Sequence, residues 1–123
     1  MHNFRKLDIW IKSVNFVTEI YRVTESLPSK EKYGLISQLE RASVSIPTNI
    51  AEGSAKTSNK DFARFLEMSI GSAYEVETEL LVSYNLEYIN KDSYEKLQNE
   101  LVILEKMLTA FKNQLNQTIE HRQ

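Results

Sequence analysis

The C-terminal part of the chain carries an unbroken heptad pattern. Large apolar residues follow one another there at steps of three and four: Tyr94, Leu97, Leu101, Leu104, Leu108, Phe111 and Leu115. This spacing keeps the side chains on one face of an α-helix, and that face has to be buried against other helices. The pattern therefore predicts one long helix of a helical bundle.

Three earlier segments show the same spacing. On the first, the residues expected to be buried are Leu7, Trp10, Val14, Val17 and Tyr21. The second contains Pro47, which removes a hydrogen-bond donor, so we expect one kinked helix in preference to two short ones. The third begins with a predicted cap, Ser58 with Asp61, and has a small-residue cluster around Gly71 that predicts close approach of another helix.

The four segments are joined by short connections, which predicts an antiparallel up-down-up-down order. The fold class is therefore all-α, a four-helix bundle with a kinked second helix. One domain over residues 1–123 is expected, with helices at about residues 6–27, 31–54, 59–87 and 91–117. A 34-residue helical repeat is the rival architecture, but the segments share no internal similarity.

Composition excludes several functional classes. The chain has no cysteine, which removes disulfides, thiolate metal sites and cysteine nucleophiles together. Charged residues interrupt the first twenty positions, so no export signal is expected, and no apolar run approaches the ~20 residues of a membrane span. We expect a cytoplasmic protein that does not enter a membrane.

The sequence does not favour catalysis. Its two histidines, His2 and His121, lie near the termini and are expected to be solvated. Glu75 and Glu79 are one helical turn apart, but no nitrogen ligand accompanies them, so no metal site is predicted. Phosphate-binding loops and nucleophile elbows are absent as well, and we predict no cofactor and no enzymatic activity.

A polar stripe runs along the second helix beside its apolar face. It consists of Gln38, Arg41, Ser45, Thr48 and Glu52, next to Asn49 in a core-like position. Arg41 and Glu52 are about 16 Å apart along the axis and cannot pair with each other. The stripe is either a solvated flank or a polar network at a helix or subunit contact, made by Gln38, Arg41, Ser45, Asn49 and Glu52.

Two small basic clusters are candidates for binding nucleic acid. One consists of Lys56, Lys60 and Arg64, and the other of Arg5, Lys6 and Lys12. The first cluster lies at the start of a helix, where an anion is favoured. Ordinary solubility also explains such residues, and no aromatic stacking platform is expected among them. Tyr33 and Tyr88 are interpreted as packing residues near helix ends.

The second helix closely resembles the signature of the proteins encoded by intervening sequences in bacterial 23S ribosomal RNA genes. The matching residues are Tyr33-Gly34-Leu35, Gln38-Leu39, Arg41-Ala42, Ser45-Ile46-Pro47 and Asn49-Ile50-Ala51-Glu52-Gly53. Further matches downstream are Phe62, Phe65-Leu66, Gly71-Ser72 and Glu75-Val76-Glu77, with departures at Glu40 and Ser43.

This resemblance implies a four-helix bundle that forms homo-oligomers. Relatives include the accessory variability determinant of diversity-generating retroelements, which implies a ring-shaped pentamer and contact with RNA or DNA through basic residues. We therefore expect an oligomeric nucleic-acid-binding protein. A protein-binding scaffold without nucleic-acid contact is the alternative.

Overall fold

Four long helices make up the structure, a computed structural model that describes residues 2–122, with side chains described through residue 118. The helices are α1 Asp8–Thr24, α2 Leu35–Ser54, α3 Asn59–Asn85 and α4 Lys91–Arg122. Two short 3-10 helices precede α1 and α2, namely η1 Phe4–Lys6 and η2 Ser29–Glu31. The predicted all-α four-helix bundle is confirmed.

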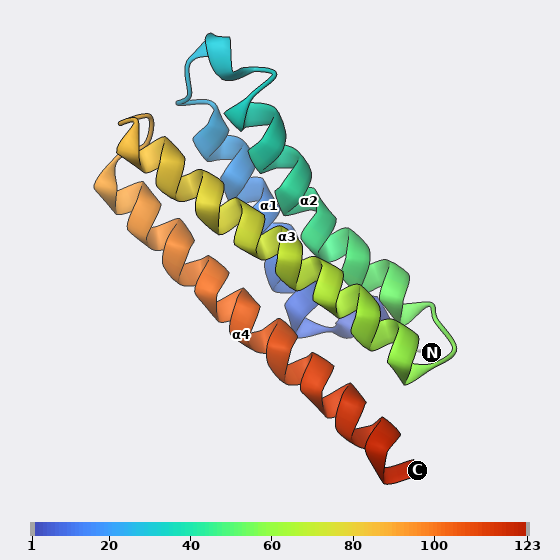
Figure 1. Ribbon diagram of the computed structural model, residues 1–123. Helices are drawn as coiled ribbons and strands as arrows, with labels where there is room; N and C mark the ends of the chain where they lie inside the picture. The colour runs from blue at the N-terminus through green and yellow to red at the C-terminus, as the bar shows by residue number, and fades with distance from the viewer. Residues whose placement is uncertain (1, 123) are drawn as a thin grey trace.

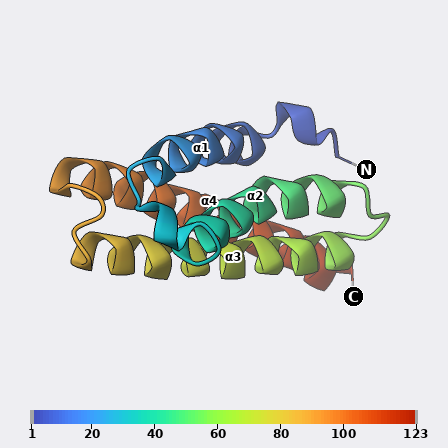
Figure 2. The ribbon, with the colours of Figure 1, turned by 90° about the horizontal axis from the view of Figure 1, so that it is seen from above.

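Consecutive helices run in opposite directions (Figure 1). Each helix packs on its two neighbours around the bundle, in the order α1, α2, α3, α4 and back to α1. The view turned by 90° shows that the N-terminus, the α2–α3 connection and the end of α4 lie at one end of the molecule (Figure 2). The other two connections lie at the opposite end (Figures 1 and 2).

The core follows the predicted pattern on three of the four helices. On α4 the heptad leucines are buried, and Tyr94 and Phe111 pack at its edge. On α2 and α3 the apolar residues spaced by three and four also lie in this core, namely Leu39, Ala42 and Ile46 on α2 and Phe62, Leu66, Ala73, Val76 and Leu80 on α3. The chain has no cysteine and therefore no disulfide, so apolar burial of this kind supplies most of its stability.

The predicted buried face of α1 is wrong by about one residue. Its buried residues are Ile9, Ser13, Phe16, Ile20 and Thr24, whereas Trp10 and Val17 are half-buried and Tyr21 is exposed. The predicted and the observed residues are both spaced by three and four. The observed set includes Ser13 and Thr24, so a search for apolar residues does not find it. Burial does not leave them unpaired, because Ser13 donates to the Trp10 carbonyl at 2.9 Å and Thr24 to the Glu40 carboxylate at 2.8 Å.

Helix α2 begins later than predicted. Pro28 starts a short 3-10 turn, and Gly34 then leaves the helical region with φ −112° and ψ −114°. The Glu31 carboxylate accepts a hydrogen bond from the Leu35 amide at 3.3 Å, so Glu31 caps α2. The helix then continues without interruption through Pro47, which excludes two short helices, and the predicted kink stays a prediction.

The end of α2 and the starts of α3 and α4 lie where predicted, and the remaining helix ends differ from prediction by a few residues. Helix α1 ends at Thr24, where the amides of Ser26 and Leu27 form tight turns ahead of Pro28. Helix α3 ends before Glu87, which has a left-handed φ of 64°. No glycine or proline interrupts the polar tail of α4, so this helix runs on to Arg122.

Small residues bring α2 and α3 close together. Buried Ser69 donates to the Ile46 carbonyl of α2 at 2.9 Å. Near the end of α2, a Cβ on Gly53 would lie 2.7 Å from the Phe65 Cβ and 2.8 Å from the Phe62 ring. Gly53 is therefore required for this contact. Gly71 itself faces open space, and the close approach predicted for its small-residue cluster is made by Ser69 and Ser72 against α2.

Replacing each of the two glycines by alanine should change the free energy of unfolding in opposite directions. Gly53→Ala should lower the free energy of unfolding by about 1–3 kcal/mol, because the new methyl group overlaps two phenylalanines. Gly71→Ala should raise it by up to about 1 kcal/mol, because alanine favours the helix and meets no neighbour. Urea unfolding of both variants and the parent measures the difference; equal effects of the two substitutions would contradict the packing described here.

Candidate nucleic-acid interface and assembly surface

Five of the six predicted basic residues lie at one end of the bundle. Arg5 and Lys6 belong to η1, while Lys56, Lys60 and Arg64 lie on the α2–α3 connection and the first turns of α3. The amide of His2 donates to the Ser54 carbonyl at 3.3 Å, which ties the N-terminal segment to the end of α2. We call the surface formed by residues 2–6 and 54–65 the basic end.

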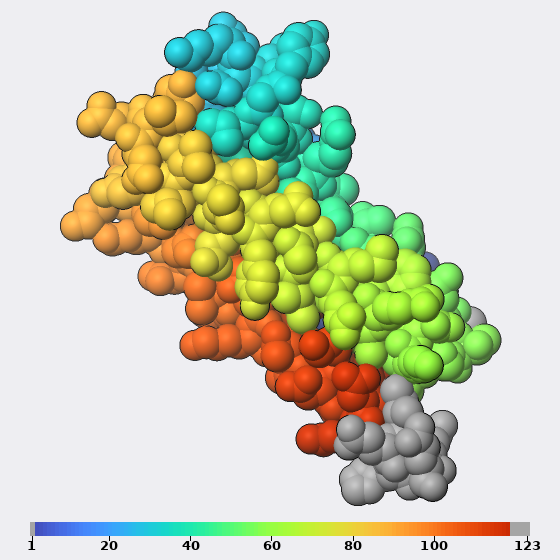
Figure 3. All heavy atoms as spheres, viewed as in Figure 1, coloured from blue at the N-terminus to red at the C-terminus, as the bar shows by residue number. Residues whose placement is uncertain are grey.

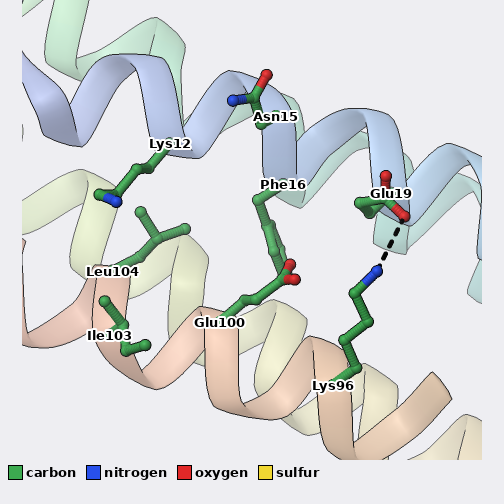
Figure 4. Close-up of a pocket in the computed structure, with 8 residues that line it drawn as sticks. All are labelled: Lys12, Asn15, Phe16, Glu19, Lys96, Glu100, Ile103 and Leu104. Atoms are coloured by element: carbon green, nitrogen blue, oxygen red, sulfur yellow. Dashed lines mark ion pairs between the residues drawn. The ribbon is translucent and has the colours of Figure 1, made fainter. Parts of the chain in front are cut away.

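Lys12, the sixth predicted residue, lines a separate cleft of about 350 Å³ between α1 and α4. Phe16 and Leu104 lie at its base, and the Lys12 side chain extends from α1 toward Leu104 (Figure 4). Glu19 and Lys96 form an ion pair across the cleft at 3.9 Å. Lys12 therefore belongs to a different surface feature from the other five cations.

The start of α3 is capped as predicted. The Asp61 amide donates to the Ser58 hydroxyl at 3.1 Å, and the Asp61 carboxylate pairs with Arg64 at 3.2 Å. No acceptor lies near the first two amides of the helix, those of Asn59 and Lys60, within the part of the chain that the structure describes. Free amides at a helix N-terminus favour an anion.

Sequence reasoning missed the aromatic partners of these cations. The Arg5 guanidinium lies 4.5 Å from the centre of the Phe4 ring, and the Lys56 ammonium lies 4.9 Å from that of Phe65. The expectation that no aromatic platform accompanies the basic residues is therefore wrong. For Arg5 the signal was adjacency in the sequence, because Phe4 directly precedes it. Lys56 and Phe65 are nine residues apart, and only the fold brings them together.

His2 is exposed, as expected, and its ring also packs edge-to-face on Phe62 at 5.1 Å and on Phe111 at 5.9 Å. The prediction for His121 lies outside the described side chains.

Charge is separated along the bundle. The half that includes the basic end (residues 2–14, 52–67 and 108–118) has seven basic and four acidic residues, a formal charge of +3. The other half (residues 15–51 and 68–107) has seven basic and twelve acidic residues, a formal charge of −5. A net charge of −2 therefore hides a cationic end that attracts anions locally.

Part of the predicted polar stripe forms a network within the chain. The Asn49 amide donates to the Ser45 carbonyl at 2.9 Å and to its hydroxyl at 3.0 Å. That hydroxyl in turn lies 2.6 Å from the Ser72 hydroxyl of α3. Ser45 and Asn49 thus join α2 to α3. Gln38, Arg41 and Glu52 are exposed and take no part in this network.

Beside this network the surface opens into what we call the α2–α3 groove, with a volume of about 850 Å³. Its lining includes Tyr33, Gln38, Arg41, Ser45, Gly71, Ser72, Tyr74, Glu75 and Glu79. Arg41 donates a hydrogen bond to the Ser37 hydroxyl at 3.4 Å and forms no ion pair with any described carboxylate. Tyr33 is 88% exposed, so its interpretation as a packing residue is wrong.

Two half-buried carboxyl groups lie beside α3. Burial, and then the charge of Glu75, raises the pKa of Glu79 to about 7, and one Glu79 oxygen is buried without a partner. Across the α3–α4 contact, burial raises the pKa of Glu105 to about 7, with further contributions from a hydrogen bond and the charge of Glu77. Both groups are therefore partly protonated at neutral pH.

Neither a metal centre nor a membrane span is found in the described part of the chain. Its residues contain no group of three or more histidine, cysteine or acidic side chains placed to hold a metal ion. Within the same residues, every helix falls short of the length and apolarity needed to cross a membrane.

A comparison with models of known protein families shows which family this chain belongs to. A family model described as 23S rRNA-intervening sequence protein matches residues 5–110. The chain belongs to this family. The matched region contains the polar stripe, the α2–α3 groove and the five clustered cations, from Arg5 to Arg64.

A solved structure supports the assignment to the 23S rRNA-intervening sequence proteins. It is the crystal structure of a protein of unknown function from the S23 ribosomal protein family of Bacteroides thetaiotaomicron. The two chains are 26% identical, with a TM-score of 0.76, over 85% of this chain and 97% of the other. A comparison with curated proteins finds no match.

The raised pKa values predict a dependence of stability on pH. The folded protein keeps protons on Glu79 and Glu105 up to about pH 7, whereas the unfolded chain releases them near the ordinary value of 4.5. Unfolding therefore releases protons between these values, so stability should fall as pH rises from about 4.5 to 7 and then level off.

Glu79→Gln tests this dependence. At pH 8 the variant should be more stable than the parent, by about 1 kcal/mol, because it removes a half-buried charge that solvent only partly screens. At pH 4.5 the two proteins should be equally stable. Thermal unfolding across this range measures the difference, with Glu25→Gln as the exposed control. A parent that is most stable at pH 8 would contradict the raised pKa values.

Proposed function

We propose that this protein acts by binding and not by catalysis: copies assemble through the α2–α3 groove, and the basic end holds RNA or DNA. The separation of charge carries this proposal, because it gathers five cations on one end of an acidic protein. The lack of cysteine and the position of both histidines near the termini support a role without catalysis.

Nucleic acid is favoured at the basic end for two reasons. Lys56 and Lys60 are exposed beside the free amides that begin α3, and both kinds of group bind phosphate. Arg5 and Lys6 extend the same surface on η1. One copy offers too few contacts for tight binding. A homo-oligomer, a pentameric ring as the resemblance implies, would repeat the site and sum its contacts.

The α2–α3 groove has the character of a protein interface. Tyrosine and arginine are the residue types that dominate binding energy at interfaces, and Tyr33, Arg41 and Tyr74 line this groove. Arg41 has no carboxylate partner among the described residues of its own chain, and Gly71 leaves room for an approaching side chain. On the face shown in Figure 3, α3 crosses the front of the molecule between α2 and α4, open to a neighbour.

Reversing two charges of the basic end should weaken nucleic-acid binding. The double variant Lys60→Glu/Arg64→Glu should retain less labelled RNA and DNA on filters than the parent. The slope of log K against log salt should fall by roughly 0.7–0.9 for each phosphate that the protein no longer neutralises.

The matched control is Lys30→Glu/Lys91→Glu, which changes the net charge equally at the opposite end of the bundle and away from the α2–α3 groove. It should bind like the parent. Equal losses in the two double variants would mean that net charge alone matters, and equal, salt-insensitive retention by all three proteins would refute the proposed interface.

Assembly has its own test. Light scattering of the parent should give a multiple of 14.3 kDa, and Arg41→Ala combined with Tyr33→Ala should shift the mass toward that of one chain. Arg22→Ala, in an exposed ion pair on α1, is the control. Asn49→Leu is less informative than Arg41→Ala, because the Asn49 amide is already bonded within the chain. A parent of 14.3 kDa at all concentrations would contradict assembly.

The second candidate is a protein-binding scaffold without nucleic-acid contact. The exposed Tyr33 and the Arg41 side chain without a described carboxylate partner favour it, since the α2–α3 groove suits a different protein as well as a second copy. Pull-down from the native cell with and without nuclease separates the two functions, because only a protein partner survives digestion.

A further inference from the structure

Two half-buried aromatic rings at the basic end each carry a cation on one face. Phe4 of η1 lies under Arg5, and Phe65 of α3 lies under Lys56, at 4.5 and 4.9 Å from the ring centres. The rings come from segments far apart in the sequence, which the hydrogen bond from His2 to Ser54 holds together. Cations and flat apolar surfaces are thus interleaved at this end.

The bundle holds both rings from behind. Phe4 packs edge-to-face on Trp10, with ring centres 5.1 Å apart and planes at 71°. Phe65 rests against Gly53, where the absence of a side chain lets its Cβ approach α2. Neither ring is free to withdraw into the core, and a flexible charged side chain lies over the outer face of each.

We infer that the basic end binds single-stranded nucleic acid, with unpaired bases stacking on Phe4 and Phe65 and phosphates held by the neighbouring cations. This inference rests on the proposed function and names its ligand class. A base offers a larger flat surface than a cation, so it displaces Arg5 or Lys56 from the ring, and the displaced side chain then meets the adjacent phosphate. Bases in a duplex already stack on one another, so a duplex gains only the phosphate contacts.

The remaining charges agree with this arrangement. Lys6 and Lys60 are exposed and extend the cationic surface on both sides of the rings. Asp61, the nearest acidic residue of α3, is held by Arg64 at 3.2 Å, which reduces its repulsion of a phosphate. The surface therefore offers stacking and charge together, the combination that single strands require.

Trp10 provides a direct readout, because it is the only tryptophan and contacts Phe4. Titration with oligo(dT) or oligo(rU) of about 15 nucleotides, a length that covers one such site, should change its fluorescence, whereas a duplex of equal length should not. In fluorescence anisotropy with labelled oligo(dT), Phe4→Leu and Phe65→Leu should each weaken binding by between about 5- and 150-fold, with the salt slope unchanged.

Two further variants keep this test specific. Phe65→Tyr retains a flat ring and should bind like the parent, while Tyr21→Leu removes an exposed ring of α1 outside the basic end and should have no effect. Circular dichroism of each variant shows whether the bundle is intact, and the pair Phe65→Tyr and Phe65→Leu separates stacking from folding.

The outcomes distinguish this inference from the proposed function. Salt-dependent binding that is equally tight for duplex and single strand, or unaffected by both Phe→Leu variants, would overturn stacking and leave the nucleic-acid interface standing. No retention of any nucleic acid would overturn both. A Trp10 response to phosphatidylglycerol vesicles with none to oligonucleotides would reassign the surface to anionic membranes.

Discussion

The contact between α2 and α3 is the constraint on which the other features depend. Gly53, which has no side chain, and several small serines let the two helices approach until Ser69 reaches the Ile46 carbonyl and Ser45 reaches Ser72. Because these are directional hydrogen bonds in a tightly packed region, they fix the register of α3 on α2 as well as its distance. A shift of α3 by one turn would break both bonds and drive Gly53 away from Phe65.

That register sets the two surfaces of interest. Near the middle of the bundle it leaves Arg41 and Glu79 on facing walls of the α2–α3 groove. At the end of α2 it presses Phe65 against Gly53, so the ring stays half-exposed under Lys56 and does not sink into the core. The same backbone proximity thus forms a groove suited to protein contact and a surface suited to nucleic acid.

Periodicity in the sequence was enough for the fold, because four strongly amphipathic segments with short connections leave few alternatives. Periodicity did not predict which face of α1 is buried. That face includes Ser13 and Thr24, whose burial is tolerated because their hydroxyls are hydrogen-bonded, and the pattern of apolar residues does not reveal such bonds. The basic residues were found from spacing, but the convergence of the two clusters and the placement of Lys56 over Phe65 depend on how the chain folds between η1, α2 and α3.

The positions of the two surfaces restrict how assembly and binding can cooperate. The α2–α3 groove lies in the acidic half of the molecule and the basic end in the other, so a neighbour in the groove does not cover the cations. Side-by-side copies that point the same way would align their basic ends on one face, where phosphate contacts add along a single strand. Copies that point in opposite directions would place each basic end beside an acidic half and weaken its attraction for anions. Cyclic symmetry about an axis parallel to the helices is therefore the arrangement in which assembly strengthens binding.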